Sequence, residues 1–403
     1  MHATVNEQMD VIRKGTKEII PEDELVRKIE KSIKSKKPLN IKLGCDPSRP
    51  DLHIGHAVVL NKLREFQDFG HNAILIIGDF NGMVGDPSGK NKTRPQLTFE
   101  ETRKNGESYF EQASIILNKK NTKIVYNSEW LGKLDLHEMI NILSKFTVQR
   151  ILERDDFTKR LRDQQEIGLH EILYPIMQGY DSYAIKSDVE LGGTDQKFNN
   201  LIGRDMQKRF GQEPQVVLLM PLLEGTDGSE KMSKSLNNYI GISDEPKEIF
   251  GKTMSIPDVL IYKYFELGTR LLPSKLEEIK KLLEDPKNNP RDYKRMLGFE
   301  LVKLYYDEET AKGAVDEFNK IFIRKEIPDE IPEFILNEKS IKLVNLITAF
   351  KLAESNGIAR RLIEQGGVSI DGEKIEDVNY VVEKRKEFVL KVGKRKFLKV
   401  IIK

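Results

Sequence analysis

The chain contains 403 residues, of which 38% are hydrophobic and 32% charged, and its formal net charge is +2. This length predicts two or three domains with sizeable cores. No apolar run approaches the ~18 residues of a membrane-spanning helix, and the charged N-terminal residues lack the apolar stretch of a secretory signal. With Cys45 as the only cysteine, an intrachain disulfide is excluded, which favours a reducing, cytoplasmic location.

Residues 1–40 predict one or two polar helices, one of them starting near Pro21. Short apolar runs at residues 41–44 and 72–78 predict strands, and residues 57–69 between them predict a helix. Two strands joined by one helix favour a right-handed crossover and a mostly parallel sheet. Residues 216–220 predict a third buried strand, ending at a proline.

Residues 99–188 are expected to be mainly helical and to form an insertion between the halves of this sheet. After Ile242 the pattern changes to charged helices, such as those predicted at 274–283 and 293–306. The last 65 residues predict two helices, a turn at Asp371-Gly372 and alternating strands. The expected division is an α/β domain with N-terminal helices over residues 1–242, a helical domain over 243–335 and a small α+β domain over 340–403.

The charges are unevenly distributed along the chain. Residues 341–403 hold 14 Lys and Arg against 8 Asp and Glu, so this segment carries +6 and the remainder −4. Such an asymmetry fits either contact with a polyanion or an ordinary solvated basic surface.

The strongest local pattern is Leu-His-Ile-Gly-His at residues 52–56, after the first strand and at the start of a helix. His53 and His56 are three residues apart and therefore share a helix face. A helix N-terminus offers unpaired N–H groups and partial positive charge, which suit phosphate, and Gly55 would let a base or ribose approach the backbone. A metal pair or surface histidines are the alternatives, but the other histidines supply no ligand pattern for a metal.

A second pattern, Lys-Met-Ser-Lys-Ser at residues 231–235, follows the strand that ends at Met220. It therefore lies at the carboxyl edge of the sheet, where open α/β folds bind ligands. Lys231 and Lys234 could move onto a triphosphate as charge develops on the leaving group. Taken alone, the segment could equally be a solvated basic turn.

Together the two patterns resemble the signature pair of the class I aminoacyl-tRNA synthetases, in which both motifs enclose ATP. The resemblance implies a Rossmann-like catalytic domain, with ATP as a substrate that carries its own Mg²⁺ and no metal held by the protein. His53, His56, Lys231 and Lys234 would be catalytic. The implied ATP-binding residues are Asp46, Ser48, His53, Gly55, His56, Asp195, Lys231, Met232, Ser233, Lys234 and Ser235.

Three further segments, at residues 85–90, 174–181 and 192–196, resemble the tyrosyl branch of that class over nearly the whole chain. Tyr174, Gln178 and Asp181 have the spacing of one helix face. By resemblance Asp181 would bind the phenol hydroxyl of tyrosine, and Tyr174 and Gln178 the ammonium group. The implied tyrosine-binding residues are Gly44, Asp86, Tyr174, Gln178, Asp181 and Gln196.

One position departs from the tyrosyl pattern. Many tyrosyl enzymes carry a second phenol-binding residue, a tyrosine, where this chain has Lys42. The lysine could turn toward Asp181 or toward solvent, and the phenol contacts are open at this point.

The C-terminal segment resembles an RNA-binding module of the alpha-L type, which grips structured RNA through phosphates and shape. Ser355 is expected to cap its second helix. The resemblance implies tRNA-Tyr as a partner, anticodon reading by the helical domain, and a homodimer. The implied tRNA-binding residues are Lys90, Arg94, Lys351, Arg360 and Arg361.

Three other functions compete with a tyrosyl enzyme. A tryptophanyl enzyme shares the fold but gives no reason for Gln178 and Asp181 together, and a nucleotidyltransferase needs neither the second motif nor an RNA-binding tail. An RNA-binding scaffold derived from an inactive synthetase would not need intact His53, His56, Lys231 and Lys234.

Overall fold

The structure is a computed structural model, and it describes residues 3–45, 52–83, 98–321, 332–336, 340–383, 387–393 and 396–402. The chain divides into two compact units, Met1–Ala311 and Lys312–Lys403.

The first unit is built on a six-stranded sheet with the strand order β1-β6-β5-β2-β3-β4. The pairs among β2 to β6 are parallel, while β1 runs antiparallel to β6 at one edge. This confirms the Rossmann-like α/β fold class. The strands are β1 (Glu18–Ile20), β2 (Asn40–Cys45), β3 (Asn72–Ile77), β4 (Thr122–Tyr126), β5 (Val189–Gly193) and β6 (Val216–Met220).

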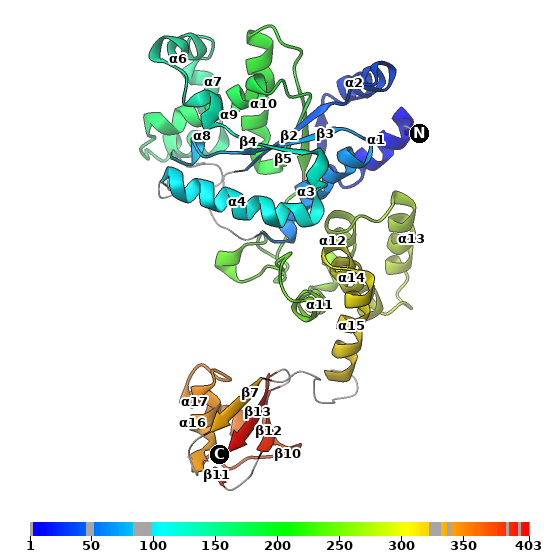
Figure 1. The fold of residues 1–403 in the computed structure, drawn as a ribbon, viewed down its shortest axis with the longest axis vertical. Helices are drawn as coiled ribbons and strands as arrows, with labels where there is room; N and C mark the ends of the chain where they lie inside the picture. The colour runs from blue at the N-terminus through cyan, green and yellow to red at the C-terminus, as the bar shows by residue number, and fades with distance from the viewer. Residues whose placement is uncertain are drawn as a thin grey trace. The chain divides into compact units, whose positions relative to one another are not determined.

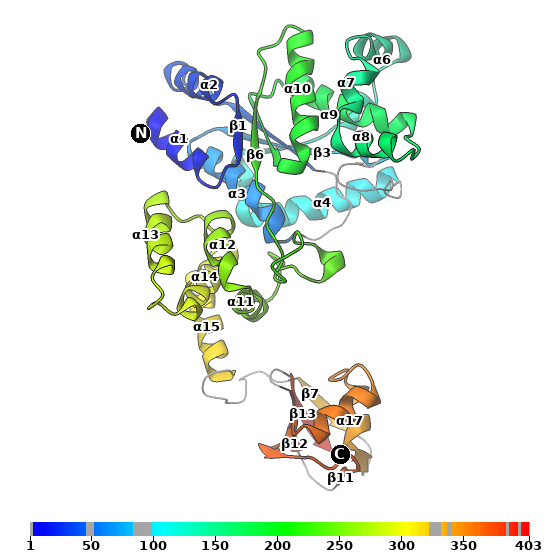
Figure 2. The same ribbon diagram turned by 180° about the vertical axis from the view of Figure 1, so that it is seen from behind.

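Helices cover both faces of the sheet: α9 and α10 lie on one side, and α3 and α4 on the other (Figures 1 and 2). The predicted helices near the N-terminus and after the first strand are confirmed. The bounds are α1 (Val5–Arg13), α2 (Glu22–Ser35), α3 (Ile54–Asp68), α4 (Phe99–Ile116), α5 (Ser128–Leu131), α6 (Leu136–Leu143), α7 (Val148–Leu152), α8 (Asp155–Arg162), α9 (Leu169–Ala184) and α10 (Lys197–Arg209).

The central strands are apolar because both faces are covered. All five residues of β6 are buried, as are the last five of β3. Continuous apolar runs are typical of parallel strands between two helical layers, and each fully buried Val, Leu or Ile side chain contributes roughly 1.5–3 kcal/mol. The result is a rigid sheet whose carboxyl edge can hold functional groups in fixed positions.

Helices α11 (Pro246–Met254), α12 (Ile261–Gly268), α13 (Pro273–Glu284), α14 (Pro290–Tyr305) and α15 (Glu308–Asn319) follow the sheet. The two helices predicted here are therefore confirmed. Helix α14 packs against α11 and α12, and α12 contacts α3. A separate helical domain starting at residue 243 stays a prediction.

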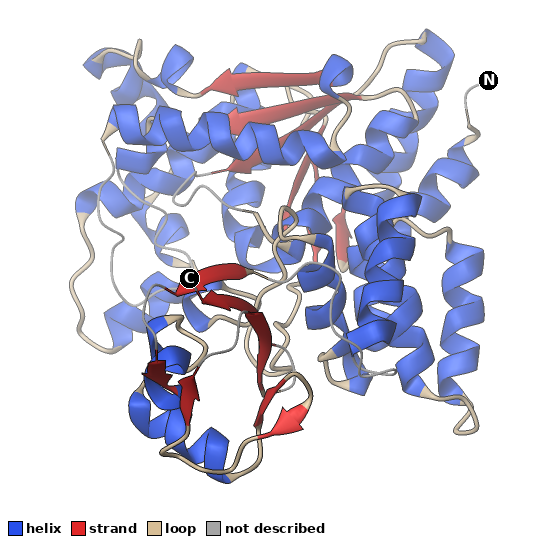
Figure 3. Cartoon of the chain, turned by 60° about the horizontal axis from the view of Figure 1, so that its bottom comes forward, coloured by secondary structure: helices blue, strands red, loops and turns tan. Residues whose placement is uncertain are grey.

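The second unit contains a five-stranded sheet in the order β10-β9-β12-β13-β7 and a two-stranded sheet of β8 and β11 (Figure 3). The predicted succession of two helices, turn and strands is confirmed: Asp371 and Gly372 have φ of 51° and 87° between β9 and β10, which suits an Asp-Gly hairpin turn. The elements are β7 (Glu333–Leu336), β8 (Ser340–Lys342), α16 (Leu343–Ala349), α17 (Asn356–Glu364), β9 (Val368–Ile370), β10 (Glu373–Lys374), β11 (Val381–Glu383), β12 (Glu387–Val392) and β13 (Lys396–Ile402).

Within the described ranges, no helix combines the length and the apolar character that crossing a membrane requires.

Candidate active site

The site lies where the strand order reverses. Strand β2 pairs with β3 on one side and with β5 on the other, and all three strands are parallel. The connections that follow β2 and β5 therefore leave the sheet from neighbouring carboxyl ends and run in different directions. Such a switch point is the usual ligand site of open parallel sheets. The histidine motif follows β2, and the Lys-Met-Ser-Lys-Ser loop follows β6.

His53 is the N-cap residue of α3, and His56 lies in the first turn. The backbone N–H of His53 donates to Nδ1 of His56 at 3.3 Å, and the two ring centroids are 3.9 Å apart. A neutral imidazole that accepts at Nδ1 carries its proton on Nε2. His56 therefore presents an Nε2–H donor at the helix N-terminus.

Both imidazoles are neutral at physiological pH. Burial lowers the pKa of His53 to about 2, and the nearby His56 and the positive charge of Lys234 act in the same direction. Although His56 keeps solvent access, the protein packed around its ring lowers its pKa to about 4, and Lys234 again adds to the shift. The pair can bind phosphate as hydrogen-bond donors, while the positive charge must come from lysines.

The structure brings the two motifs together although they are far apart in sequence. A Cβ atom placed on Gly55 would lie 3.5 Å from Cβ of Met232. The N–H of Ile54 donates to the carbonyl of Ile240 at 2.9 Å, and that of Ile242 donates to Leu52 at 3.2 Å. The imidazoles and the lysine loop therefore face one shared region.

Asn238 ties the lysine loop to itself. Its Oδ1 accepts from the N–H of Ser233 at 2.7 Å, and its Nδ2 donates to Asp227 at 2.6 Å and to the carbonyl of Lys231 at 3.3 Å. Its own carbonyl accepts from the N–H of Thr226 at 2.8 Å. One buried amide thus holds both arms of the loop.

Helix α12 supports the start of this loop. The buried Tyr264 donates its hydroxyl to the carbonyl of Glu224 at 2.7 Å, and Lys263 forms an ion pair with the Glu224 carboxylate at 2.7 Å. The helices that follow the sheet therefore help to fix the loop.

Tyr239 lies between cationic and imidazole groups. Nζ of Lys234 is 5.4 Å and Nζ of Lys252 is 4.8 Å from its ring centroid, and the ring of His53 is 6.3 Å away. Aromatic faces attract cations at these distances. The ring therefore gives Lys234 a resting position close to the histidines.

Asp181, the residue proposed from the sequence to recognise a phenol, is buried on α9. The indole Nε1–H of Trp130 donates to its Oδ1 at 2.7 Å, and Nδ2 of Asn127 lies 3.4 Å from its Oδ2. Burial raises the pKa of Asp181 to about 7, against the opposing effects of Lys42, Trp130 and Asn127. Fixed donors thus hold a carboxylate that is close to its titration point.

Tyr174 and Gln178 belong to the same helix, Tyr174 buried and Gln178 half-buried. The amide nitrogen of Gln178 is 3.0 Å from Oδ1 of Asn200 and 3.4 Å from Oε1 of Glu190. With the nitrogen engaged there, the amide oxygen turns away from them, and an acceptor suits an ammonium ligand.

Lys42 does not face solvent: its side chain is fully buried, so that possibility is excluded. Its Nζ lies 2.7 Å from Oε1 of Glu190 and donates to Oγ of Ser182 at 2.7 Å and to the carbonyl of Gln178 at 3.1 Å. These three partners match the three N–H donors of an ammonium group.

Of the remaining site residues predicted in the first unit, some are described by the structure and others are not. Gly44, at the end of β2, is exposed, and a Cβ there would meet nothing within 4 Å, so a ligand can approach this backbone. Asp195 and Gln196 lie in the turn between β5 and α10, and Nδ2 of Asn199 donates to Oε1 of Gln196 at 3.1 Å. Five predicted site residues lie outside the described ranges: Asp46, Ser48, Asp86, Lys90 and Arg94.

Lys351, Arg360 and Arg361 are exposed in the second unit, the two arginines on α17. Ser355 caps this helix, as predicted, by accepting from the N–H of Ile358 at 3.3 Å.

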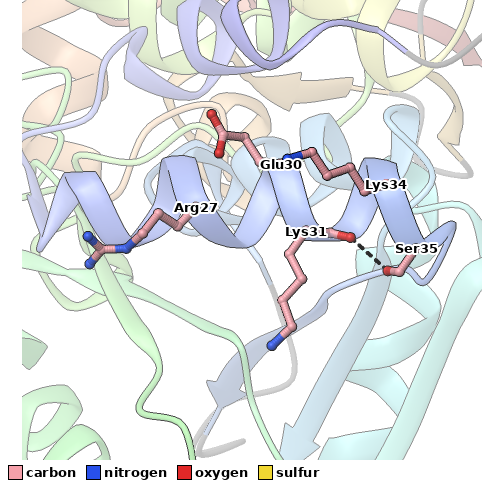
Figure 4. Close-up of a pocket in the computed structure, with 5 residues that line it drawn as sticks. All are labelled: Arg27, Glu30, Lys31, Lys34 and Ser35. Atoms are coloured by element: carbon pink, nitrogen blue, oxygen red, sulfur yellow. Dashed lines mark hydrogen bonds between the residues drawn. The ribbon is translucent and has the colours of Figure 1, made fainter.

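A hollow elsewhere in the first unit is formed by α2 alone and contains none of the predicted residues (Figure 4). Its lining residues are Arg27, Glu30, Lys31, Lys34 and Ser35. Across the part of the chain that is described, no cluster of three His, Cys, Asp or Glu side chains could hold a metal ion.

Several groups around the site were missed from the sequence: Asn127, Trp130, Glu190, Asn238 and Tyr239. Two signals were present. Trp130 is the only tryptophan of the chain, and Glu190 is an acid inside the apolar strand β5. The contacts of Asn127 with Asp181 and of Tyr239 with His53 depend on long-range packing, whereas Asn238 contacts its own loop but has no recognisable sequence pattern.

The sequence model described as "tRNA synthetases class I (W and Y)" matches residues 34–323, which is most of the chain. The chain therefore belongs to this family of class I tRNA synthetases. The model described as "Tyrosine--tRNA ligase SYY-like C-terminal domain" matches residues 323–400.

Within the family, the similarity is to proteins named Tyrosine--tRNA ligase. The chain is 51% identical to the one from Carboxydothermus hydrogenoformans, covering 98% of this chain and 97% of the relative. It is 53% identical to the one from Chlorobaculum tepidum, with the same coverage of both chains.

Solved structures support the fold. Tyrosyl-tRNA synthetase from Archaeoglobus fulgidus, crystallised with L-tyrosine, is 23% identical and superposes with a TM-score of 0.62 over 78% of this chain and 100% of that chain. The truncated mitochondrial tyrosyl-tRNA synthetase of Aspergillus nidulans gives a TM-score of 0.65 at 20% identity, covering 80% of this chain and 95% of that chain.

Proposed function

We propose that this protein is a tyrosine–tRNA ligase, which activates L-tyrosine with ATP and transfers the tyrosyl group to the 3′ end of tRNA-Tyr. The observation that carries the proposal is the meeting of the histidine motif and the lysine loop, with a Cβ on Gly55 only 3.5 Å from Met232. ATP bound there would have donors from α3 on one side and mobile positive charge on the other.

In the first step, a carboxylate oxygen of tyrosine attacks the α-phosphorus of ATP, and the bond to the bridging oxygen of pyrophosphate breaks. Negative charge develops on the phosphates, and groups aimed at that charge lower the barrier. Nε2–H of His56 would donate to a phosphate oxygen, and Lys231 and Lys234 would stabilise the leaving pyrophosphate, whose Mg²⁺ arrives with ATP. In the second step, a ribose hydroxyl of the tRNA attacks the carbonyl carbon, and AMP leaves.

The remaining residues would hold the substrates. Asp181 would accept the phenol hydroxyl, while Tyr174, Gln178 and Asp86 would bind the ammonium group. Gln196 and the backbone at Gly44 would lie near the carboxylate. Contacts to ATP are proposed for Asp46, Ser48, His53, Gly55, Asp195, Met232, Ser233 and Ser235.

The test is pyrophosphate exchange into ATP with each amino acid in turn. We expect exchange with tyrosine only. Exchange with tryptophan would assign the chain to the tryptophan-specific members of its family, and no exchange at all would contradict the proposal.

Asn238→Ala is expected to slow tyrosyl-adenylate formation by about tenfold or more, because the loop loses several hydrogen bonds of roughly 1 kcal/mol each. The affinity for tyrosine should not change, since tyrosine contacts other elements. Single-turnover kinetics measure the rate, and Asn237→Gly, which removes an exposed neighbouring side chain at a φ of 52°, is the matched control. An unchanged rate in Asn238→Ala would show that these bonds do not position the loop.

For tRNA, we propose contacts from Lys90 and Arg94 and from the C-terminal residues Lys351, Arg360 and Arg361. The Arg360→Ala/Arg361→Ala double variant should raise KM for tRNA about tenfold and weaken its salt dependence, because two phosphate contacts are lost. Tyrosine-dependent pyrophosphate exchange should be unaffected. The control is Lys34→Ala/Lys37→Ala, which removes two exposed charges from the first unit; equal losses in both double variants would refute a specific role for α17.

We further propose a cytoplasmic homodimer. Several large apolar side chains on α6 to α9 are exposed and would be covered by a second copy; they are Leu136, Ile140, Val148, Leu161 and Leu169. Isolated exposed apolar residues are ordinary, but a group on neighbouring helices marks an interaction surface. Sedimentation should give twice the chain mass.

A further inference from the structure

We infer that Lys42 does not bind the phenol of tyrosine, and that it acts with Glu190 as a positioning residue for Gln178 and Asp181. This inference rests on the proposed function and concerns how that site is held.

The Lys42 ammonium group has no donor left for a ligand. Its side chain is completely buried, and its contacts to Glu190, Ser182 and the Gln178 carbonyl lie between 2.7 and 3.1 Å. An ammonium group has three N–H bonds, and all three are directed at protein acceptors. A phenol contact would require one of these buried bonds to break.

Glu190 connects Lys42 to the substrate-binding face of α9. Its Oε1 lies 2.7 Å from Nζ of Lys42 and 3.4 Å from Nε2 of Gln178. Its Oε2 accepts from Ser182 at 3.2 Å and from the amide of Gln215. Together with Oδ1 of Asn200 at 3.0 Å, the carboxylate therefore orients the Gln178 amide, and Lys42 fixes the carboxylate.

Lys42 also acts on Asp181 through its charge. The groups acting on the Asp181 carboxylate are Lys42 on β2, Glu190 on β5, and Trp130 and Asn127 near α5. Lys42 lowers the pKa of Asp181, whereas burial and, more weakly, Glu190 raise it. Removing both members of the pair should therefore favour the protonated form of Asp181.

Lys42→Met alone would leave Glu190 as an unpaired buried carboxylate, which can prevent folding. The informative variant is Lys42→Met/Glu190→Gln, which removes both charges of the pair together and keeps an amide near Gln178. Wild type and double variant would be compared by pyrophosphate exchange over a range of pH, with KM for tyrosine and for ATP measured separately.

We expect KM for tyrosine to rise about tenfold in the double variant, with KM for ATP unchanged. The midpoint of kcat/KM against pH should move upward. A folded double variant with wild-type KM and an unchanged pH midpoint would show that the pair only stabilises the fold.

A second outcome would also overturn the inference. At pH 8.5 the remaining loss should weaken phenylalanine as a competitive inhibitor of tyrosine-dependent exchange as well as raise KM for tyrosine, because the ammonium group is common to both. A loss confined to tyrosine would make Lys42 a direct phenol ligand. Failure of the wild-type protein to activate tyrosine would instead contradict the proposed function itself.

Discussion

Asp181→Ala is expected to lower kcat/KM for tyrosine in pyrophosphate exchange by about 10- to 150-fold, since a hydrogen bond to a charged group contributes roughly 1.5–3 kcal/mol. The indole N–H of Trp130, which donates to Asp181 at 2.7 Å, would also lose its acceptor. KM for ATP should stay within about twofold of the wild-type value. Wild-type kinetics for tyrosine in this variant would show that another group recognises the substrate.

The same residue gives the activity a pH dependence. Because the pKa of Asp181 is about 7, its carboxylate becomes protonated as the pH falls through this value, and kcat/KM for tyrosine should fall with it. The histidines do not contribute, since the pKa values of His53 and His56 are about 2 and 4. In Asp181→Asn this decrease of kcat/KM at low pH should be absent. If the decrease persisted, a group other than Asp181 would be its cause.

Asp181→Asn also tests how this carboxyl group makes the free energy of unfolding depend on pH. In the wild-type protein the folded state has a higher pKa at this carboxyl than the ordinary value of 3.8, so the unfolded state binds fewer protons between about pH 4 and 7. The free energy of unfolding therefore decreases as the pH rises through this window. The asparagine variant should lack this contribution, which denaturant titrations at pH 5 and 8 can measure.

His56→Ala is expected to slow tyrosyl-adenylate formation by about 100- to 1,000-fold, the usual cost of removing one donor aimed at developing charge. Tyrosine affinity should remain within about twofold, because Asp181 and Gln178 lie on α9 and do not depend on α3. Single-turnover rates and equilibrium binding of tyrosine separate the two effects.

His56→Gln is the matched variant, since its amide restores an N–H donor near the same place. It should recover part of the lost rate. If His56→Ala kept the wild-type rate of activation, the role assigned to the histidine motif would be wrong.

Much of the fold could be predicted from local pattern. The apolar runs at residues 72–78 and 216–220 became β3 and β6, because a buried parallel strand needs no alternation. The two short strands β1 and β4 were missed. Strand β1 has three half-buried residues and β4 only one buried residue, Val125, so their pairing depends on the sheet already present.

The site was predictable in its motifs and not in its supports. The histidine motif, the lysine loop and the acid on α9 could be proposed from the sequence because their segments resemble known motifs, and the structure brings the first two together. The partner of Lys42 could not be predicted from the sequence, because Glu190 lies far along the chain. The two residues meet because β2 and β5 are neighbours and Lys42 is opposite Glu190 in their register. Such contacts are fixed by sheet order.

The two backbone bonds between residues 52–54 and 240–242 set a mechanical limit on the lysine loop. They anchor the downstream end of the loop against the first motif, while its upstream end is held where Tyr264 donates to the carbonyl of Glu224 and where the N–H of Met232 donates to the carbonyl of Leu223 at 2.9 Å. Any movement for nucleotide entry and pyrophosphate exit would therefore be confined to the lysine side chains and the few residues between these anchors, and the histidines would keep their places throughout the reaction cycle.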